Sequence, residues 1–273
     1  MGVQSQVTPA VGYLGGKRRL LSRLRPLFPA DEVPYAEPFV GMGALYLDLR
    51  ARGHRGPAVL ADVNPAISDF WQCVHDRDLS AALLREVMHL GSLSQTKEER
   101  VRLLNTPVEA GPPRAAAFLW LTNTAFANTP VVPRPDGTWI GCQTGKMASA
   151  TKHGMSFPFA AVIGRLERIS ALLAGLPTAV LYNAADACTI CPSGGRAYLD
   201  PPYEGSRAHI MVGRGWVDAA LRLREPRLVV VSETPRATLM ASALGMREER
   251  GEVAASRSGW NGTCGKREEC LFI

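Results

Sequence analysis

Residues 196–203 read Arg-Ala-Tyr-Leu-Asp-Pro-Pro-Tyr, a short apolar run that ends in an aspartate, two prolines and a tyrosine. The first four residues predict a strand, and the prolines end it because they have no backbone N–H to donate. The chain therefore stiffens as it leaves the strand, between the carboxylate of Asp200 and the ring of Tyr203. Such a corner can grip a flat polar ligand, although by itself it also fits an ordinary proline-rich turn with a capping aspartate.

This corner suits substitution at the exocyclic amino group of a nucleobase, which is a poor nucleophile because its lone pair is delocalised into the ring. The carboxylate of Asp200 and the rigid carbonyl of Pro201 can accept the two N–H bonds of such an amine. Tyr203 can stack on a base that has been flipped out of its helix. The candidate catalytic residues are therefore Asp200, Pro201, Pro202 and Tyr203.

Further short apolar runs predict strands on either side of a long central stretch. Continuous apolar runs are typical of strands that helices cover on both faces, so we expect a parallel α/β fold with one doubly wound, Rossmann-like sheet. The additional predicted strands are 35–39, 58–62, 179–182, 228–231 and 270–273.

The central stretch has a different character. Apolar residues at helical spacing predict helices over 79–90 and 159–173, with these apolar stripes as helix core. We expect an inserted, mainly helical region over 73–177, and one sheet domain made of 1–72 and 178–273.

Within the insertion, residues 129–155 are rich in Gly, Pro, Thr and Ser, which predicts a polar loop or hairpin. Its basic residues Arg134, Lys146 and Lys152 are candidates for contacts to nucleic acid, and solvated loop charges are the alternative.

Composition favours an intracellular, soluble globular protein. The chain has 273 residues and a formal net charge of +6, which is compatible with a polyanionic partner. It has no apolar run of about 18 residues that could span a membrane, and its N-terminus lacks an apolar signal core. Cys188 and Cys191 have the spacing of half a zinc site, but no matching pair completes it, so we expect no metal and reduced thiols.

A second motif lies early in the chain, where Phe39-Val40-Gly41-Met42-Gly43 follows a predicted strand and opens a predicted helix. Two glycines let the backbone turn tightly under a nucleotide-like ligand. Asp62 ends the next predicted strand about 20 residues further on, where an acidic side chain can accept from both hydroxyls of a ribose. The pattern fits a nicotinamide cofactor or S-adenosylmethionine, and the second needs no pyrophosphate cradle.

A third motif, Tyr13-Leu14-Gly15-Gly16-Lys17, is not a phosphate-binding loop, because Arg18 stands at the position of the required Ser or Thr. A lysine on a glycine turn can instead bind a ligand carboxylate, such as that of a methionine moiety. The alternative is the exposed basic start of a helix.

The order of the motifs resembles the Dam-like family of DNA adenine N6-methyltransferases over nearly the whole chain. Phe118–Asn123, Val231–Glu233 and Glu269–Ile273 are weaker echoes of that family. The four matching pieces are Leu14–Lys17, Glu37–Gly43, Leu60–Asn64 and Asp200–Tyr203.

The resemblance implies S-adenosylmethionine as cofactor, DNA as partner and the insertion as target-recognition region. It also implies a cytoplasmic location in a bacterial or bacteriophage-infected cell. Two roles stay open: a restriction-linked methyltransferase, with a cognate restriction endonuclease as a further partner, and an orphan or phage methyltransferase without one. Carried over residue by residue, the cofactor contacts are Tyr13, Gly16, Lys17, Glu37, Pro38, Phe39, Gly41, Gly43, Asp62, Asn64, Asp186 and Asp200.

The chain departs from the family in the insertion. Relatives that read GATC carry Asn-Gly-Leu-aromatic-Arg where this chain has Ala127-Asn128-Thr129-Pro130-Val131, so GATC does not follow. We expect methyl transfer to N6 of a flipped adenine. The alternatives are cytosine N4 or RNA as acceptor, a DNA-binding relative without catalysis, and a nicotinamide-dependent oxidoreductase.

Overall fold

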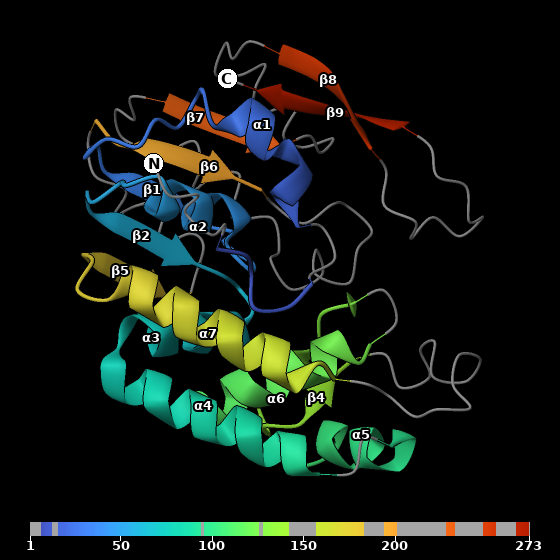
Figure 1. Cartoon of the computed structure of the whole chain (residues 1–273). Coiled ribbons are helices and arrows are strands. Elements are labelled where there is room, and N and C mark those ends of the chain that lie inside the picture. The colour runs from blue at the N-terminus through green and yellow to red at the C-terminus, as the bar shows by residue number, and fades with distance from the viewer. Residues whose placement is uncertain are drawn as a thin grey trace. The chain divides into compact units, whose positions relative to one another are not determined.

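The computed structural model describes residues 7–12, 16–93, 96–125, 128–141, 157–182 and 194–200, together with the backbone of three later strands (Figure 1). It divides into two compact units. The sheet unit comprises Arg18–Val40, Gly53–Val63 and Pro177–Ile273, and the helical unit comprises Met1–Lys17, Gly41–Arg52 and Asn64–Leu176.

The sheet unit contains a seven-stranded sheet in the described part of the chain, in the order β5-β2-β1-β6-β7-β9-β8. The first five strands of this order are parallel, whereas β9 is antiparallel to β7 and β8 is antiparallel to β9. The prediction of an α/β protein with a mostly parallel sheet is therefore confirmed. The strands are β1 (Tyr35–Glu37), β2 (Ala58–Ala61), β5 (Thr178–Leu181), β6 (Arg196–Leu199), β7 (Leu228–Ser232), β8 (Glu248–Ala254) and β9 (Lys266–Phe272).

Two features of the sheet differ from the expectation. The segment predicted as a parallel strand at 270–273 belongs to the longer β9, which pairs antiparallel with β7 and with β8. Such an antiparallel pair at the edge of a parallel sheet is common in mixed sheets. At the other edge of the sheet, β5 is partly exposed, whereas full burial was expected.

Small side chains line one face of the sheet, and aromatic rings line the other. Ala36 and Ala197, which are directly opposite each other on β1 and β6, form a buried cluster with Val59 and Ala61 of β2. On the opposite face, the ring of Phe28 meets Tyr35 and Tyr198 edge-on, with centroids 5.7 and 6.1 Å away. Phe28 follows the short helices η1 (Lys17–Leu20) and α1 (Leu21–Leu24), whose apolar residues are also buried.

The helical unit is built around four helices that pack on one another, α3, α4, α6 and α7, with α2 against α7 and α5 against α6. The predicted helices over 79–90 and 159–173 are confirmed as α4 and α7. Leu79, expected in the buried stripe of α4, is 37% exposed. The elements are α2 (Ala44–Ala51), α3 (Pro65–His75), α4 (Arg77–Ser92), α5 (Lys97–Leu104), α6 (Pro112–Asn123), α7 (Phe159–Leu173) and the hairpin strands β3 (Val132–Pro133) and β4 (Trp139–Ile140).

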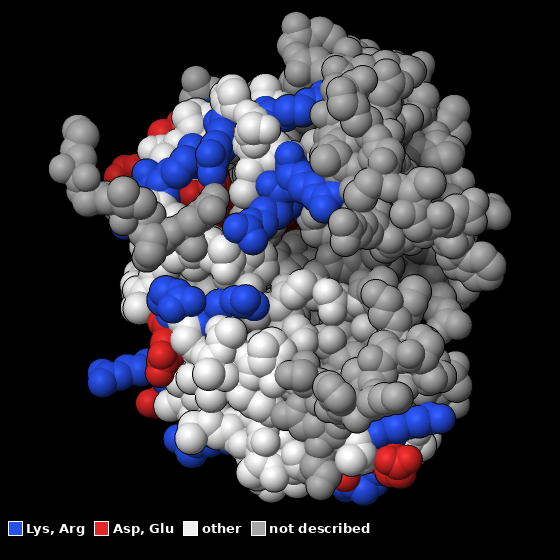
Figure 2. All heavy atoms as spheres, turned by 45° about the vertical axis from the view of Figure 1, so that its right-hand side comes forward, with Lys and Arg blue, Asp and Glu red and all other residues white. Residues whose placement is uncertain are grey.

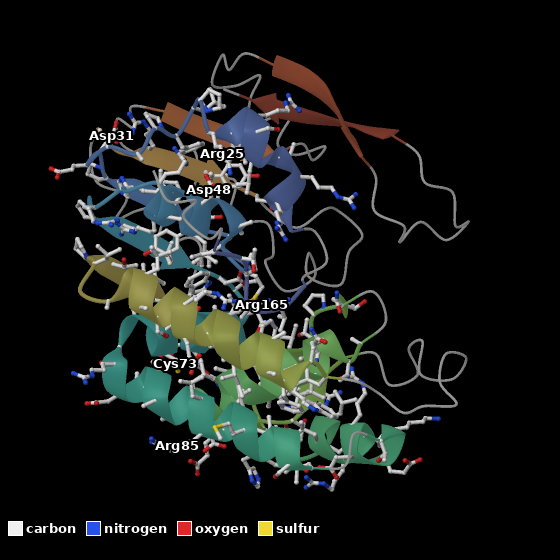
Figure 3. All side chains as sticks on the ribbon, viewed as in Figure 1. Arg25, Asp31, Asp48, Cys73, Arg85 and Arg165 are labelled. Carbon is white, nitrogen blue, oxygen red and sulfur yellow. The ribbon has the colours of Figure 1, made fainter. Side chains whose placement is uncertain are left out.

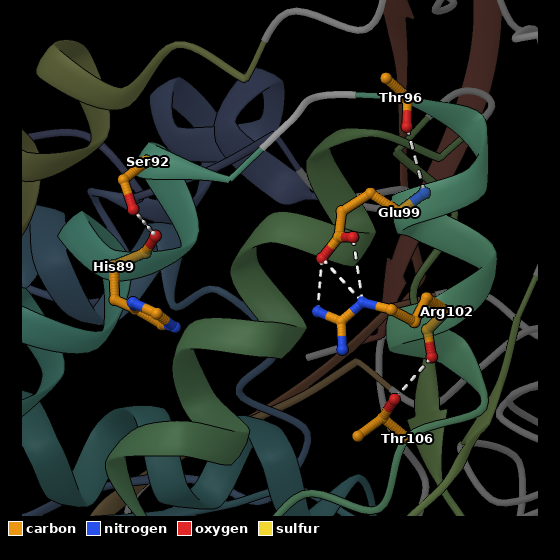
Figure 4. A network of polar contacts seen from close by, with 6 residues as sticks. All are labelled: His89, Ser92, Thr96, Glu99, Arg102 and Thr106. Carbon is orange, nitrogen blue, oxygen red and sulfur yellow. Dashed lines mark hydrogen bonds and ion pairs between the residues drawn. The ribbon is translucent and has the colours of Figure 1, made fainter.

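Side-chain caps explain where these helices begin. The carboxylate of Asp76 accepts from two backbone N–H groups of α4, both at 2.9 Å. The hydroxyl of Thr96 accepts from the backbone N–H of Glu99 at 3.2 Å and so starts α5 (Figure 4). Glu99 in turn pairs with Arg102 one turn further along the same helix. Such caps satisfy backbone donors that have no partner inside the helix.

The predicted domain division, with 73–177 as an insertion, stays a prediction. By packing, α2 and α3 belong with the helical unit. In the described part of the chain, the helices are all too short or too polar to cross a bilayer.

Candidate active site

Three carboxylate residues lie at the carboxyl ends of neighbouring parallel strands in the sheet unit. Glu37 is the last residue of β1, Asp62 comes directly after β2, and Asp200 comes directly after β6. β1 pairs in parallel with both β2 and β6, so the three strand ends lie at one edge of the sheet. Neighbouring strands are about 4.8 Å apart, which places the three residues in adjacent positions along that edge. We call Glu37, Asp62 and Asp200 the carboxylate edge.

The carboxylate edge coincides with a reversal of strand order. The chain runs from β1 to β2 and β5 on one side, and later returns to β6 and β7 on the other side of β1 (Figure 1). In open α/β sheets, ligands bind outside the carboxyl ends of the strands at such a switch point. Here the switch point lies between β1, which ends at Glu37, and β6, which leads to Asp200.

Glu37 is fixed by its neighbours rather than exposed to solvent. Its side chain is only 3% exposed, and the hydroxyl of Tyr35 donates to its carboxylate at 2.8 Å. The Tyr35 ring is itself packed against Phe28. A buried carboxylate that accepts such a bond has a defined orientation, which suits the recognition of a ligand.

The chain beyond β1 stays beside β2. The backbone N–H of Val40 donates to the carbonyl of Ala61 at 2.9 Å, which extends the pairing past the end of β1. Pro38 and Phe39 are buried in this extension. Asp62, which directly follows Ala61, is 9% exposed, and Asp200 is partly exposed.

The tight turn expected of Gly41 and Gly43 is present in the helical unit. Both glycines have positive φ angles, +49° and +61°, and Gly43 is the N-cap residue of α2. Left-handed backbone of this kind favours glycine because it places a Cβ too close to the following carbonyl. We call residues 41–43 the glycine turn.

Trp71 of α3 packs against the glycine turn. Its indole N–H donates to the carbonyl of Gly41 at 2.8 Å, and its ring lies where a side chain on Gly43 would be. Trp71 could not be identified from the sequence, because nothing in a helix sequence shows which distant loop a buried aromatic residue contacts. Its position in a fully buried stretch of α3 shows only that it belongs to the core.

Lys17 begins η1 and is 8% exposed, whereas Gly16 before it is exposed. A lysine this buried is uncommon unless its ammonium group is paired. The burial of Lys17 disfavours the alternative in which this residue belongs to an exposed basic helix start. The next two residues, Arg18 and Arg19, are exposed and do fit that alternative.

Asn64 has a structural task in the helical unit. Its side-chain oxygen accepts from the backbone N–H of Ala66 at 3.1 Å and so caps α3, which Pro65 opens. Its side-chain nitrogen donates to the carbonyl of Val131 at 2.8 Å, just before the β3–β4 hairpin. Asn64 thereby ties the start of α3 to the hairpin.

Arg134 lies on the β3–β4 hairpin, so a hairpin is present within the predicted basic region. Its guanidinium is exposed, but one nitrogen donates to the carbonyl of Trp139 at 2.7 Å and to the hydroxyl of Thr138 at 3.0 Å. Asp136 between them accepts from Thr138, which lowers its pKa. Arg134 therefore stabilises its own turn and still presents charge to solvent.

Several predicted site residues lie outside the described residues, and their roles remain predictions. They are Tyr13, Lys146, Lys152, Asp186, Pro201, Pro202 and Tyr203, and the pair Cys188 and Cys191. Within the described residues, no group of His, Cys, Asp and Glu side chains could hold a metal ion. Cys73 is buried on α3 (Figure 3), and burial raises the pKa of its thiol to about 12, so it stays protonated and inert at neutral pH.

The mostly parallel sheet, with carboxylates at its switch point, identifies the sheet unit as α/β, a class in which ligands commonly bind at the carboxyl ends of the strands. Residues 13–131 match the family model of the D12 class N6 adenine-specific DNA methyltransferases. The resemblance predicted from the order of the motifs is thus confirmed over these residues, as is the predicted enzyme class, a DNA methyltransferase that acts on adenine N6.

The matched segment includes the glycine turn and the motifs at Lys17, Glu37 and Asp62, and it ends before Asp200. The assignment of a role to Asp200 therefore rests on its own chemistry and on its place at the end of β6.

Proposed function

We propose that this protein uses S-adenosylmethionine to methylate N6 of an adenine flipped out of duplex DNA, on a doubly wound, Rossmann-like methyltransferase sheet. The observation that carries this proposal is the carboxylate edge. It brings a candidate cofactor residue, Asp62, and a candidate acceptor residue, Asp200, to the two sides of β1. A methyl donor and a methyl acceptor must meet within bonding distance, and strand ends that flank the same strand can bring them together.

The residues on the cofactor side fit the chemistry of S-adenosylmethionine. The carboxylate of Asp62 can accept from the two ribose hydroxyls, and the ammonium of Lys17 can bind the methionine carboxylate. Glu37 has a fixed, buried carboxylate that can orient the polar part of the ligand. When bound, S-adenosylmethionine supplies a methyl group that its sulfonium makes electrophilic.

On the acceptor side, Asp200 and the carbonyl of Pro201 would accept the two N–H bonds of the adenine amine, and Tyr203 would stack on the base. This arrangement turns the nitrogen lone pair out of conjugation with the ring. Asp200 need not be a strong base, because the amine becomes acidic only after it has gained the methyl group. Its contribution is alignment and electrostatics, and alignment of two reactants can be worth about 7–11 kcal/mol.

The DNA contacts are proposed to come from the insertion, through Arg134, Lys146 and Lys152. Figure 2 shows Lys and Arg side chains on the surface that it draws, in keeping with the net charge of +6. Arg134 remains exposed on its hairpin, so it is available to a phosphate. The recognition sequence, a partner endonuclease and a cytoplasmic location stay predictions.

Calorimetry with S-adenosylmethionine and with NAD tests the cofactor directly. We expect the wild type to bind S-adenosylmethionine and not NAD, and Asp62→Asn to weaken that binding at least tenfold. Asp78→Asn is the matched control, because Asp78 is an exposed aspartate on α4. Binding of NAD instead would favour the oxidoreductase alternative and overturn the proposal.

A further inference from the structure

The indole of Trp71 contacts both glycines of the glycine turn. Its N–H donates to the carbonyl of Gly41 at 2.8 Å. A Cβ added to Gly43 would lie 2.3 Å from a carbon of the same ring, closer than any real contact. Trp71 itself is fully buried. One side chain of α3 therefore fixes the direction of a carbonyl at the start of the turn and fills the space at its end.

A network of the buried residues Tyr46 and Arg50 and the half-buried His75 packs against Trp71. The ring of Tyr46 on α2 meets Trp71 edge-on at 5.5 Å, with the planes 85° apart. The hydroxyl of Tyr46 lies 3.1 Å from Nε2 of His75 and accepts from Nε of Arg50 at 3.1 Å. Because Arg50 can only donate, the hydroxyl of Tyr46 accepts from it and can donate its own proton to His75. The network thus ties α2, which follows the turn, to α3, which carries Trp71.

A glycine turn without such support samples many backbone conformations, because glycine has no Cβ to restrict it. Binding a ligand would then require the turn to be ordered at that moment, which weakens the affinity. The hydrogen bond to Gly41 removes this cost in advance. Loss of the bond also takes the indole donor away from this carbonyl, which favours rearrangement of the turn.

We propose that Trp71 is a positioning residue for the cofactor, which keeps the glycine turn in its binding conformation before S-adenosylmethionine arrives. This inference rests on the proposed function for the identity of the ligand. The arrangement of the turn itself does not depend on that identity.

The test compares Trp71→Phe with Trp120→Phe. Both variants remove an indole N–H from a fully buried tryptophan, but Nε1 of Trp120 on α6 makes no hydrogen bond within the described structure. We expect Trp71→Phe to raise the Kd for S-adenosylmethionine in calorimetry about tenfold, and Trp120→Phe to leave it within twofold. In steady-state kinetics, Trp71→Phe should raise the KM for the cofactor and leave kcat within twofold.

Amide hydrogen exchange gives a readout that does not depend on the ligand. The backbone N–H of Leu47 donates to the carbonyl of Gly43 at 2.9 Å and reports whether the turn and the start of α2 stay closed. Without ligand, it should exchange faster in Trp71→Phe than in the wild type and Trp120→Phe. If Trp71→Phe does not fold, Trp71→Tyr removes the same N–H and takes its place.

Unchanged affinity in the Trp71 variant, or exchange at Leu47 equal to that of the control, would overturn the positioning role. A loss of kcat at an unchanged KM would overturn it as well. If the wild type binds no S-adenosylmethionine, the proposed function fails, and the exchange rates alone then decide whether Trp71 holds the turn.

Discussion

At the scale of single residues, Gly43 combines two constraints that only glycine meets. Its φ of +61° is left-handed, and a Cβ there would collide with the Trp71 ring. The sequence motif predicted the tight turn correctly, because glycine spacing after a strand is a local signal. It could not predict the collision, since that depends on α3, whose distance in space from the turn is set by tertiary packing.

Replacing Gly43 by Ala should lower the free energy of unfolding by about 2–4 kcal/mol, from left-handed strain together with the ring contact. Gly175→Ala is the matched control, because Gly175 has a φ of +71° but nothing within 4 Å of an added Cβ. Gly175→Ala should lower the free energy of unfolding by the backbone strain alone, about 1 kcal/mol. Urea unfolding of both variants measures the difference, and equal losses would show that the Trp71 contact is unimportant.

His75 gives the stability a pH dependence. Burial, helped by the charge of Arg50, lowers the pKa of His75 to about 4 from its ordinary 6.5. Between these two pH values the unfolded chain binds a proton that the folded chain does not. The free energy of unfolding therefore has its full value above pH 6.5 and decreases as the pH falls towards 4.

We expect the wild type to lose about 3 kcal/mol relative to His75→Gln between pH 7 and pH 4. Denaturant unfolding at a series of pH values measures this difference. His89→Gln, which removes an exposed histidine of α4, should run parallel to the wild type instead. A difference in the free energy of unfolding between the wild type and His75→Gln that stays constant with pH would contradict a lowered pKa of His75.

At the scale of elements, α3 and α6 are joined by an ion pair inside the helical unit. The carboxylate of Asp69, which is completely buried, accepts from the guanidinium of Arg114 and from the backbone N–H of Gly111 at 3.0 Å. Removing one partner of such a pair leaves the other charge buried and uncompensated.

Arg114→Met should therefore lower the free energy of unfolding by about 3–5 kcal/mol. Arg102→Met breaks the pair with Glu99 on α5, where Arg102 is 56% exposed, and should cost no more than about 1 kcal/mol. Thermal or urea unfolding distinguishes the two. Similar losses would mean that burial of Asp69 contributes nothing to the strength of the pair.

The elements themselves were predictable where their pattern is local. Apolar periodicity identified α4 and α7, and short apolar runs identified β1, β2, β5, β6 and β7. The strand β8 was missed because Glu248–Ala254 is mostly charged and polar, as befits an edge strand that one neighbour alone supports. The antiparallel direction of β9 was missed because a sequence run does not reveal which way its partner lies.

At the scale of the whole molecule, the order of the strands brings together residues that are far apart in the chain. Glu37 and Asp200 lie at the ends of neighbouring strands, although more than half the chain separates them. Each of these residues was predicted from its own motif, and the resemblance to a family placed them in one predicted site. The pairing of β1 with β6 cannot be derived from local patterns, because it is a contact between distant segments.

The central claim is that Asp200 serves the transfer of a methyl group to adenine N6. The most direct test is mass spectrometry of nucleosides from DNA incubated with the protein and methyl-labelled S-adenosylmethionine. We predict labelled N6-methyladenine with the wild type, its loss in Asp200→Ala with DNA binding retained, and wild-type levels in Asp78→Asn. Label found only in cytosine, or unaltered transfer by Asp200→Ala, would contradict the account.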